Sequence, residues 1–146
     1  MNIDQEPGRA AMVVFADRAD CWWLRRLKPG FRHCFVALRH PPGWLVCDPL
    51  KDRIELTILD VPSSFDLPGF YVAQGHRVLL GRTAANRSEA EARFGIELLT
   101  CVAVVKRVLG IRAGSVQTPW QLFRHLNMVA HTETAWREPP SSFALT

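Results

Sequence analysis

The chain contains 146 residues, 48% of them hydrophobic and 22% charged, and its formal net charge is +4. These values are typical of one soluble globular domain with its own hydrophobic core. The basic residues are scattered along the chain, which argues against a nucleic-acid-binding surface, and no apolar stretch is long enough to span a bilayer. We therefore expect a single domain with no membrane span and no specific nucleic-acid partner.

The four cysteines, Cys21, Cys34, Cys47 and Cys101, do not have the spacing of a metal site. No two of them form a CxxC motif and the chain has no HExxH motif, so we expect no zinc and no cofactor. The N-terminus lacks a basic region followed by an apolar run, which argues against a signal peptide. The prediction is a cytoplasmic protein with free thiols.

The first half of the chain predicts three strands and one short helix. The strands are apolar runs bounded by turn residues, and Asp20 fits the N-cap of the helix. These elements are a strand at 11–15, a helix at 21–27 and strands at 31–38 and 44–48, the last two joined by Pro41-Pro42-Gly43. If Leu38 lies opposite Trp44 in this hairpin, His33 falls beside Asp48. A slip of one residue places His33 directly opposite Asp48.

The second half of the chain continues the sheet and then turns helical. Apolar alternation and turn residues predict strands at 54–59, 70–73 and 76–80. Thr118 as N-cap, followed by Pro119, predicts a helix that runs to about Leu126. The expected fold class is α+β, a small antiparallel sheet with packed helices. We expect one domain over residues 1–131 and a C-terminal tail over residues 132–146.

Residues 100–110 predict a short helix that starts at a cysteine. Thr100 fits the N-cap and Gly110 the left-handed C-cap. Cys101 then occupies the first helical position, where unpaired backbone N–H groups and the helix dipole favour the thiolate, which is the nucleophilic form. Apolar residues recur at three- and four-residue spacing, at Val104, Val105, Val108 and Leu109.

Two alternatives stay open for Cys101. Cysteine is among the most frequently buried residues, so Cys101 can be a core residue on the valine face. Ser88 and Glu91 form a capping box, and a helix that starts there and runs to Leu109 would place Cys101 mid-helix. A break near Phe94-Gly95 is favoured because glycine is a poor residue for a helix interior.

Nucleophilic cysteine chemistry needs a base beside the thiol and a partner that orients the base. Cys101, His33 and Asp48 are the candidates, since His33 begins one strand of the predicted hairpin and Asp48 ends the other. The alternative is that His33 is a surface histidine of the strand and that Asp48 merely ends its strand. Cys34 follows His33 in the strand, so the two side chains are expected on opposite faces, which makes Cys34 a poor partner for His33.

Two segments of the chain resemble the circularly permuted branch of the NlpC-like, papain-like fold. They are Gly30-Phe31-Arg32-His33-Cys34-Phe35-Val36-Ala37-Leu38 and Thr100-Cys101-Val102-Ala103-Val104-Val105-Lys106-Arg107-Val108-Leu109-Gly110-Ile111. In that branch the histidine strand comes first and the cysteine helix comes last, as in this chain. The Leu-Gly-Ile ending and the following Thr118-Pro119-Trp120-Gln121-Leu122 resemble small bacterial and phage-associated members.

The resemblance covers residues 30–126 and implies a cysteine amidase or peptidase. It would make Cys101 the nucleophile, His33 the general base and Asp48 the residue that orients the imidazole. It implies amide, ester or thioester chemistry on peptide or amide substrates, typically peptidoglycan peptides. Thr100 stands where the acyltransferase group commonly has asparagine, which argues against a lipid acyltransferase.

Two further functions are compatible with the sequence. One is a non-catalytic structural or adaptor component of an assembly such as a phage-like particle, with Trp22, Trp23, Trp136 and the Pro-rich tail as its contact surface. The other is a basic nucleic-acid-binding module, whose affinity would fall steeply with salt. In the hydrolase that the resemblance implies, the charged segment 82–97 could cover or reshape the cleft.

Overall fold

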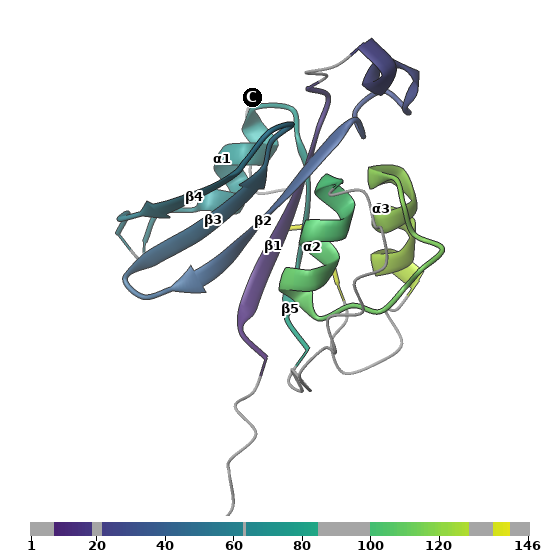
Figure 1. Ribbon diagram of the computed structural model, residues 1–146. Coiled ribbons are helices and arrows are strands. Elements are labelled where there is room, and N and C mark those ends of the chain that lie inside the picture. Colours follow the sequence, from purple (N-terminus) through teal and green to yellow (C-terminus); the bar gives the residue numbers. More distant parts are fainter. Residues whose placement is uncertain (1–7, 19–21, 63, 85–99, 129–135, 141–146) are drawn as a thin grey trace, which may run out of the picture.

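The computed structural model describes residues 8–18, 22–62, 64–84, 100–128 and 136–140. Within these residues, five strands form one antiparallel sheet in the order β4-β3-β2-β1-β5 (Figure 1). The elements are β1 (Ala10–Ala16), η1 (Trp22–Arg26, a 3₁₀ helix), β2 (His33–His40), β3 (Gly43–Pro49), β4 (Ile54–Leu59), α1 (Leu67–Ala73), β5 (Arg77–Arg82), α2 (Cys101–Leu109) and α3 (Pro119–Met128). The predicted α+β class is confirmed.

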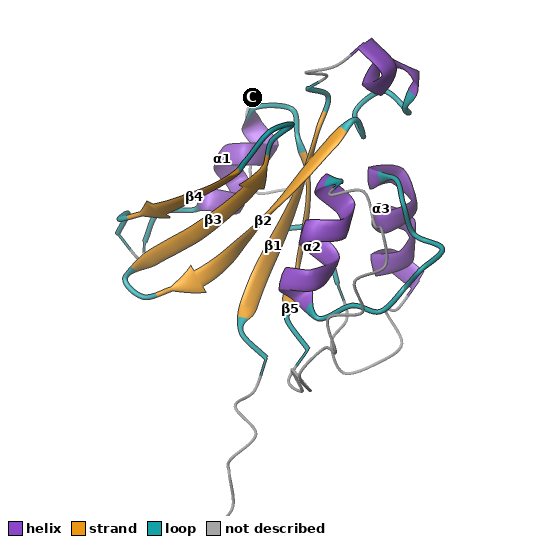
Figure 2. Ribbon diagram, viewed as in Figure 1, coloured by secondary structure: helices purple, strands orange, loops and turns teal. Residues whose placement is uncertain are grey.

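Helices lie on both faces of the sheet (Figure 2). Alternation along β2 separates its side chains between two hydrophobic clusters. Cys34 and Val36 face α2 and α3, whereas Phe35 and Ala37 face α1. β1 and β2 lie in the middle of the sheet and are almost completely buried. They therefore form a rigid base that positions the residues at the ends of these strands.

The β2–β3 hairpin forms as predicted, but its register differs by one residue from the expected one. Leu38 lies opposite Leu45, not opposite Trp44, and Val36 lies opposite Cys47. Continuing this register places Asp48 across from Phe35. Asp48 and His33 are therefore diagonal neighbours on the same face of the sheet, a separation that long side chains bridge.

The expected strand at 70–73 is wrong, because this segment belongs to helix α1. Asp66 caps the helix, and its Oδ1 accepts a hydrogen bond of 3.0 Å from the Gly69 N–H. Pro68 occupies the first turn, where its fixed φ and missing N–H suit a helix start. A short apolar run does not itself distinguish a strand from a buried helix. β5 pairs with β1 and not with the 70–73 segment.

The remaining elements follow the sequence closely. The strand at 54–59 is β4, and the predicted helix at 21–27 is present as η1. In α3 the Thr118 hydroxyl accepts a hydrogen bond of 3.2 Å from the Gln121 N–H, which is the capping role predicted for it. Among the described residues, no helix is long and apolar enough to cross a membrane.

Part of the expected C-terminal tail packs against the sheet. Arg137 pairs with Leu80 of β5 through two backbone hydrogen bonds of 2.7 and 2.9 Å. Trp136 is only 6% exposed and joins the cluster under α2 and α3. Trp136 is therefore a core residue, and the prediction that it forms a contact surface is wrong. Residues 136–140 belong to the folded part of the chain.

Replacing Gly81 with alanine is expected to destabilise the protein by roughly 1–3 kcal/mol through overpacking. A Cβ at Gly81 would lie 2.3 Å from Cδ2 of the Trp136 indole. The measurement is the urea unfolding midpoint. Gly114→Ala is the matched control, because a Cβ there meets no atom within 4 Å. Equal midpoints for the two variants would contradict the packing of Trp136 on β5.

Candidate active site

Cys101 is the first residue of α2, as the capping pattern predicts. Thr100 has an extended backbone, with φ −82° and ψ 156°, and its Oγ1 accepts a hydrogen bond of 3.1 Å from the Ala103 N–H. Gly110 ends the helix with a left-handed φ of 75°. The helix thus begins at Cys101, which excludes the alternative of one continuous helix from Ser88 to Leu109. The break expected near Phe94-Gly95 lies outside the described residues.

The apolar stripe of α2 fixes the helix on the sheet. Val105 and Leu109 are buried in the cluster formed with β2, and Val108 packs against it. Lys106 is 8% exposed and donates hydrogen bonds of 3.0 and 2.8 Å to the carbonyl groups of Ala113 and Val116. These bonds tie the segment after α2 to the helix.

His33 and Asp48 are in direct contact. His33 Nε2 lies 2.6 Å from Asp48 Oδ1. His33 is 5% exposed, so it is a buried polar residue and not the surface histidine of the alternative reading. The turn before β2 is held by the Gly30 N–H, which donates to Asp17 Oδ1 at 2.7 Å. The start of β2, and with it His33, is fixed by this turn.

Arg18, which the sequence did not indicate, binds the other side of Asp48. Its guanidinium donates hydrogen bonds of 3.2 and 3.1 Å to Oδ1 and Oδ2. Burial raises the pKa of the Asp48 carboxyl, but the hydrogen bonds and positive charges of His33 and Arg18 outweigh burial and hold that pKa below its ordinary value. Asp48 is therefore an ionised acceptor for the imidazole at neutral pH.

His33 also hydrogen bonds to Cys101, so it joins the thiol to the carboxylate. Since Nε2 faces Asp48, Nδ1 is the ring nitrogen that remains for the sulfur. Burial is the largest influence on the pKa of His33 and lowers it. The hydrogen bonds and negative charges of Asp48 and Cys101 together outweigh burial and raise the pKa to about 9. The imidazole is thus held as the cation beside the thiol.

Cys34 is the second neighbour of Cys101 and was not identified from the sequence. The hydrogen bond from the Cys34 thiol is the largest cause that lowers the pKa of Cys101. Burial opposes it, while the hydrogen bond and charge of His33 and the Cys34 backbone lower the pKa further, to about 5. Burial raises the pKa of Cys34 itself, which keeps this thiol protonated and able to donate.

The prediction that Cys34 and His33 occupy opposite faces agrees with the alternation along β2, yet both residues interact with Cys101. Cys34 lies in the cluster under α2, whereas Phe35, two residues after His33, faces α1. His33 is the first residue of β2, so its side chain lies at the edge where α2 begins. Alternation alone could not show that Cys101 is placed at this edge.

The first turn of α2 supplies backbone donors next to the sulfur. The first N–H groups of a helix have no acceptor within the helix. Thr100 accepts from Ala103 through its side chain and from Val104 through its carbonyl group, which leaves the N–H groups of Cys101 and Val102 without an acceptor among the described residues. Such donors can stabilise an anion that develops at a carbonyl carbon attacked by the thiolate.

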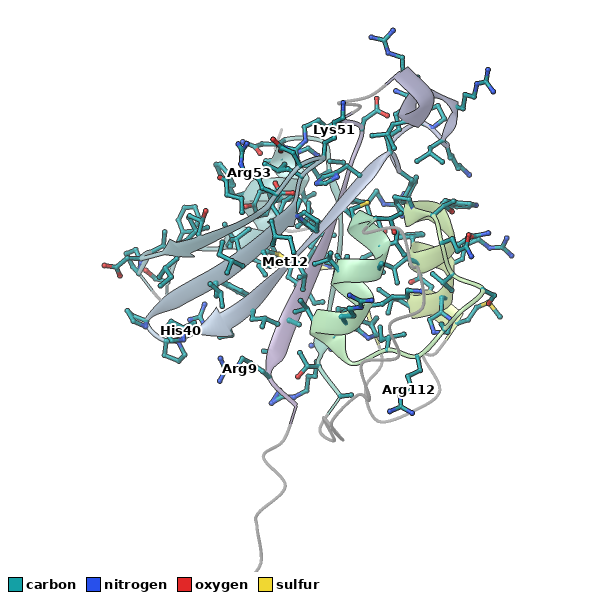
Figure 3. The ribbon with its side chains drawn as sticks, in the orientation of Figure 1. Arg9, Met12, His40, Lys51, Arg53 and Arg112 are labelled. Carbon is teal, nitrogen blue, oxygen red and sulfur yellow. The ribbon has the colours of Figure 1, made fainter. Side chains whose placement is uncertain are left out.

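Other candidate groups lie away from this arrangement. His40 is exposed at the turn end of β2, at the opposite end of the strand from His33 (Figure 3). Of the labelled basic residues, Arg9 and Arg112 also lie at the far end of the molecule, whereas Lys51 and Arg53 lie at the end where β3 closes with Asp48 (Figure 3). Among the described residues, no group of three or more His, Cys, Asp or Glu side chains could hold a metal ion.

Replacing Asp48 with asparagine is expected to lower the pKa of His33. The carboxylate is one of the two groups that raise this pKa, so without its charge Cys101 alone opposes the lowering effect of burial. The imidazolium, which persists up to about pH 9 in the wild-type protein, should then lose its proton at lower pH. The measurement is the NMR titration of the imidazole C–H signals. Asp52→Asn, at an exposed position, is the control.

No family model, no curated protein and no solved structure matches this chain.

Proposed function

We propose that this protein is a cysteine hydrolase, an amidase or peptidase that uses Cys101, His33 and Asp48 as its triad. The observation that carries the proposal is the contact of one buried imidazole with both a carboxylate and a helix-terminal cysteine. A histidine that serves only packing has no need of a thiolate and a carboxylate together. The combination of nucleophile, base and orienting acid is what acyl transfer requires.

In the proposed mechanism, the Cys101 thiolate attacks the carbonyl carbon of an amide, ester or thioester. The N–H groups of Cys101 and Val102 stabilise the oxyanion that forms. The His33 imidazolium gives its proton to the leaving amine, alcohol or thiol, and an acyl-thioester with Cys101 remains. Neutral His33 then removes a proton from water, which attacks the acyl group and releases the acid. Asp48 orients the imidazole and stabilises its cation throughout.

The chain order supports assignment to the permuted NlpC-like, papain-like type. The histidine strand β2 precedes the cysteine helix α2, and the antiparallel sheet packs directly under that helix. By the resemblance, the substrates are peptides or other amide-linked groups, with peptidoglycan-type peptides as the first class to examine. A small phage-associated protein is the corresponding biological setting.

The test is turnover by the purified full chain on a panel of amides, esters, thioesters and peptidoglycan-derived peptides. We expect release of the leaving group and, when the reaction is quenched early, an acyl adduct on the 94–106 tryptic peptide, which contains Cys101. Turnover without an adduct, undiminished in a Cys101 variant, would contradict the mechanism. A fully reactive Cys101 that hydrolyses no member of the panel would favour the alternative below.

The alternative is a non-catalytic structural or adaptor component of an assembly on the same scaffold. One observation favours it. The edge strand β4 exposes Ile54, Leu56 and Ile58 at 50%, 65% and 66%. Leu56 lies opposite Cys47, so the three side chains share the face that carries α2. Exposed apolar residues on an edge strand are typical of a protein contact. Loss of a stable complex in Leu56→Lys, with Cys101→Ser still assembling, would support this role.

A further inference from the structure

Cys34 is not one of the three triad residues, yet it interacts directly with the nucleophile. We propose that Cys34 and Cys101 form a peroxide-oxidisable dithiol site, in which Cys101 is the oxidised sulfur and Cys34 the resolving thiol that closes an intramolecular disulfide. The site is a modification site of the folded chain. Because the disulfide requires only the two sulfurs and an oxidant, it stands whether or not the protein turns over any substrate.

The fold brings the two sulfurs together from distant parts of the chain. Cys34 is the second residue of β2 and lies on the face that packs under α2, with Val36 on the same side. Cys101 packs against this cluster from the first turn of α2. Cys34 belongs to the cluster against which Cys101 packs, and its thiol is the group that acts most strongly on the Cys101 sulfur. A disulfide between strand and helix would close this contact covalently.

Access and protonation state assign the two roles. Cys34 is fully buried, whereas Cys101 is half-buried at a helix terminus, so a small oxidant reaches Cys101 first. Cys101 is also the thiolate of the pair, and the thiolate is the form that reacts with peroxide. Cys34 stays a neutral thiol until the neighbouring sulfur becomes electrophilic. The order of events is therefore oxidation at Cys101 followed by attack from Cys34.

The chemistry balances with hydrogen peroxide as the oxidant. The Cys101 thiolate attacks one peroxide oxygen, the O–O bond breaks, and sulfenic acid and hydroxide form. The Cys34 sulfur then attacks the Cys101 sulfur, the S–O bond breaks, and the Cys34 proton leaves with the hydroxyl group as water. Each sulfur is oxidised by one electron equivalent and peroxide is reduced by two. A dithiol reductant restores both thiols by exchange.

Cys47 provides an internal comparison. It is also buried in the cluster under α2, but it lies opposite Val36, two residues further along β2 than Cys34. The groups that shift the pKa of Cys47 are burial and Asp48, and Cys101 is not among them. Burial and chemistry are thus similar in Cys34 and Cys47, and contact with Cys101 is what distinguishes them. Only Cys34 should resolve the oxidised nucleophile.

The experiment treats the reduced full chain with equimolar hydrogen peroxide, blocks the remaining thiols and maps tryptic peptides without reduction. The four cysteines fall in separate tryptic peptides, 19–25, 33–39, 40–51 and 94–106. We expect a cross-link between 33–39 and 94–106, with the loss of two hydrogen atoms, which dithiothreitol reverses. In Cys34→Ser the cross-link should vanish and sulfenic acid should accumulate at Cys101, where dimedone traps it.

Cys47→Ser is the matched control and should retain the cross-link. Circular dichroism tests whether each variant is folded. If Cys34→Ser does not fold, the peptide map of the wild-type protein still shows which cysteine is cross-linked to Cys101. A cross-link of 94–106 to 40–51 or 19–25 would overturn the assignment of Cys34. A second outcome would also overturn it: Cys101 becomes sulfinic acid while Cys34 remains a free thiol that is alkylated only after unfolding. A resolving thiol would have reacted with the sulfenic acid before this further oxidation.

Discussion

Replacing Cys101 with alanine is expected to abolish hydrolysis, lowering kcat/KM by at least about 10³-fold, as removal of a catalytic nucleophile does in triad enzymes. The reason is that no other sulfur occupies the first turn of α2 beside His33; Cys34 is fully buried below it. The fold should persist, because the Thr100 cap and the buried face of α2 are unchanged. The measurement is turnover of the best substrate in the panel, with circular dichroism on the same sample.

Cys47→Ala is the control for this loss. It also removes a buried thiol from the cluster under α2, but from a position opposite Val36, away from the nucleophile. Its turnover should stay close to that of the wild-type protein at temperatures where it is folded. Equal losses in the two variants would show that the cluster, and not the Cys101 sulfur, is what activity requires.

The positions of the three candidate residues could be predicted because each obeys a local rule. A cap residue, a stripe of valines and a C-terminal glycine determine where α2 begins, so the position of Cys101 follows from residues 100–110 alone. The hairpin determines that His33 and Asp48 lie near one another. The observed register of the hairpin differs by one residue from the expected register. His33 and Asp48 are nevertheless diagonal neighbours, and His33 Nε2 reaches Asp48 Oδ1.

The neighbours of the site could not be predicted, because they depend on how distant elements pack. Cys34 contacts Cys101 only because α2 lies over the start of β2, and no local pattern reports that placement. Arg18 reaches Asp48 from the segment after β1, which has no periodicity to read. Lys106 donates to two backbone carbonyl groups of the segment after α2, which the pattern of the helix itself does not indicate. Tertiary packing decides all three.

The same limit explains the error at residues 70–73. The run Phe70-Tyr71-Val72-Ala73 is short and apolar, and its side chains alone suit a strand. Four residues earlier, Asp66 supplies a cap and Pro68 a helical φ, and these signals determine the outcome. Burial then follows, with Leu67 packed in the cluster on the α1 face of the sheet. In this segment the capping residues are a stronger signal than the apolar run.

Replacing His33 with glutamine is expected to raise the pKa of Cys101 and to suppress its alkylation at neutral pH. The wild-type thiol has a pKa of about 5, lowered first by Cys34 and then by the hydrogen bond and charge of His33. At pH 7 a group with pKa 5 is about 99% ionised and one at the ordinary value of 9 about 1%, so the rate can fall by up to ~100-fold. The remaining Cys34 hydrogen bond makes the actual fall smaller than this limit.

The measurement is the rate of iodoacetamide labelling of the 94–106 peptide from pH 4 to pH 10, with the peptide that carries Cys47 as internal reference. The wild-type rate should rise through about pH 5 and then stay level, and the His33→Gln curve should rise at a higher pH. Cys34→Ala should also move the curve upward, whereas Cys34→Ser, which keeps a donor, should move it less. Superimposable curves for wild type and His33→Gln would mean that the imidazole does not stabilise the thiolate, and the triad would lose its base. A shift in both variants would instead show that the nucleophile is activated jointly, by the imidazolium from one side and by the buried thiol from the other.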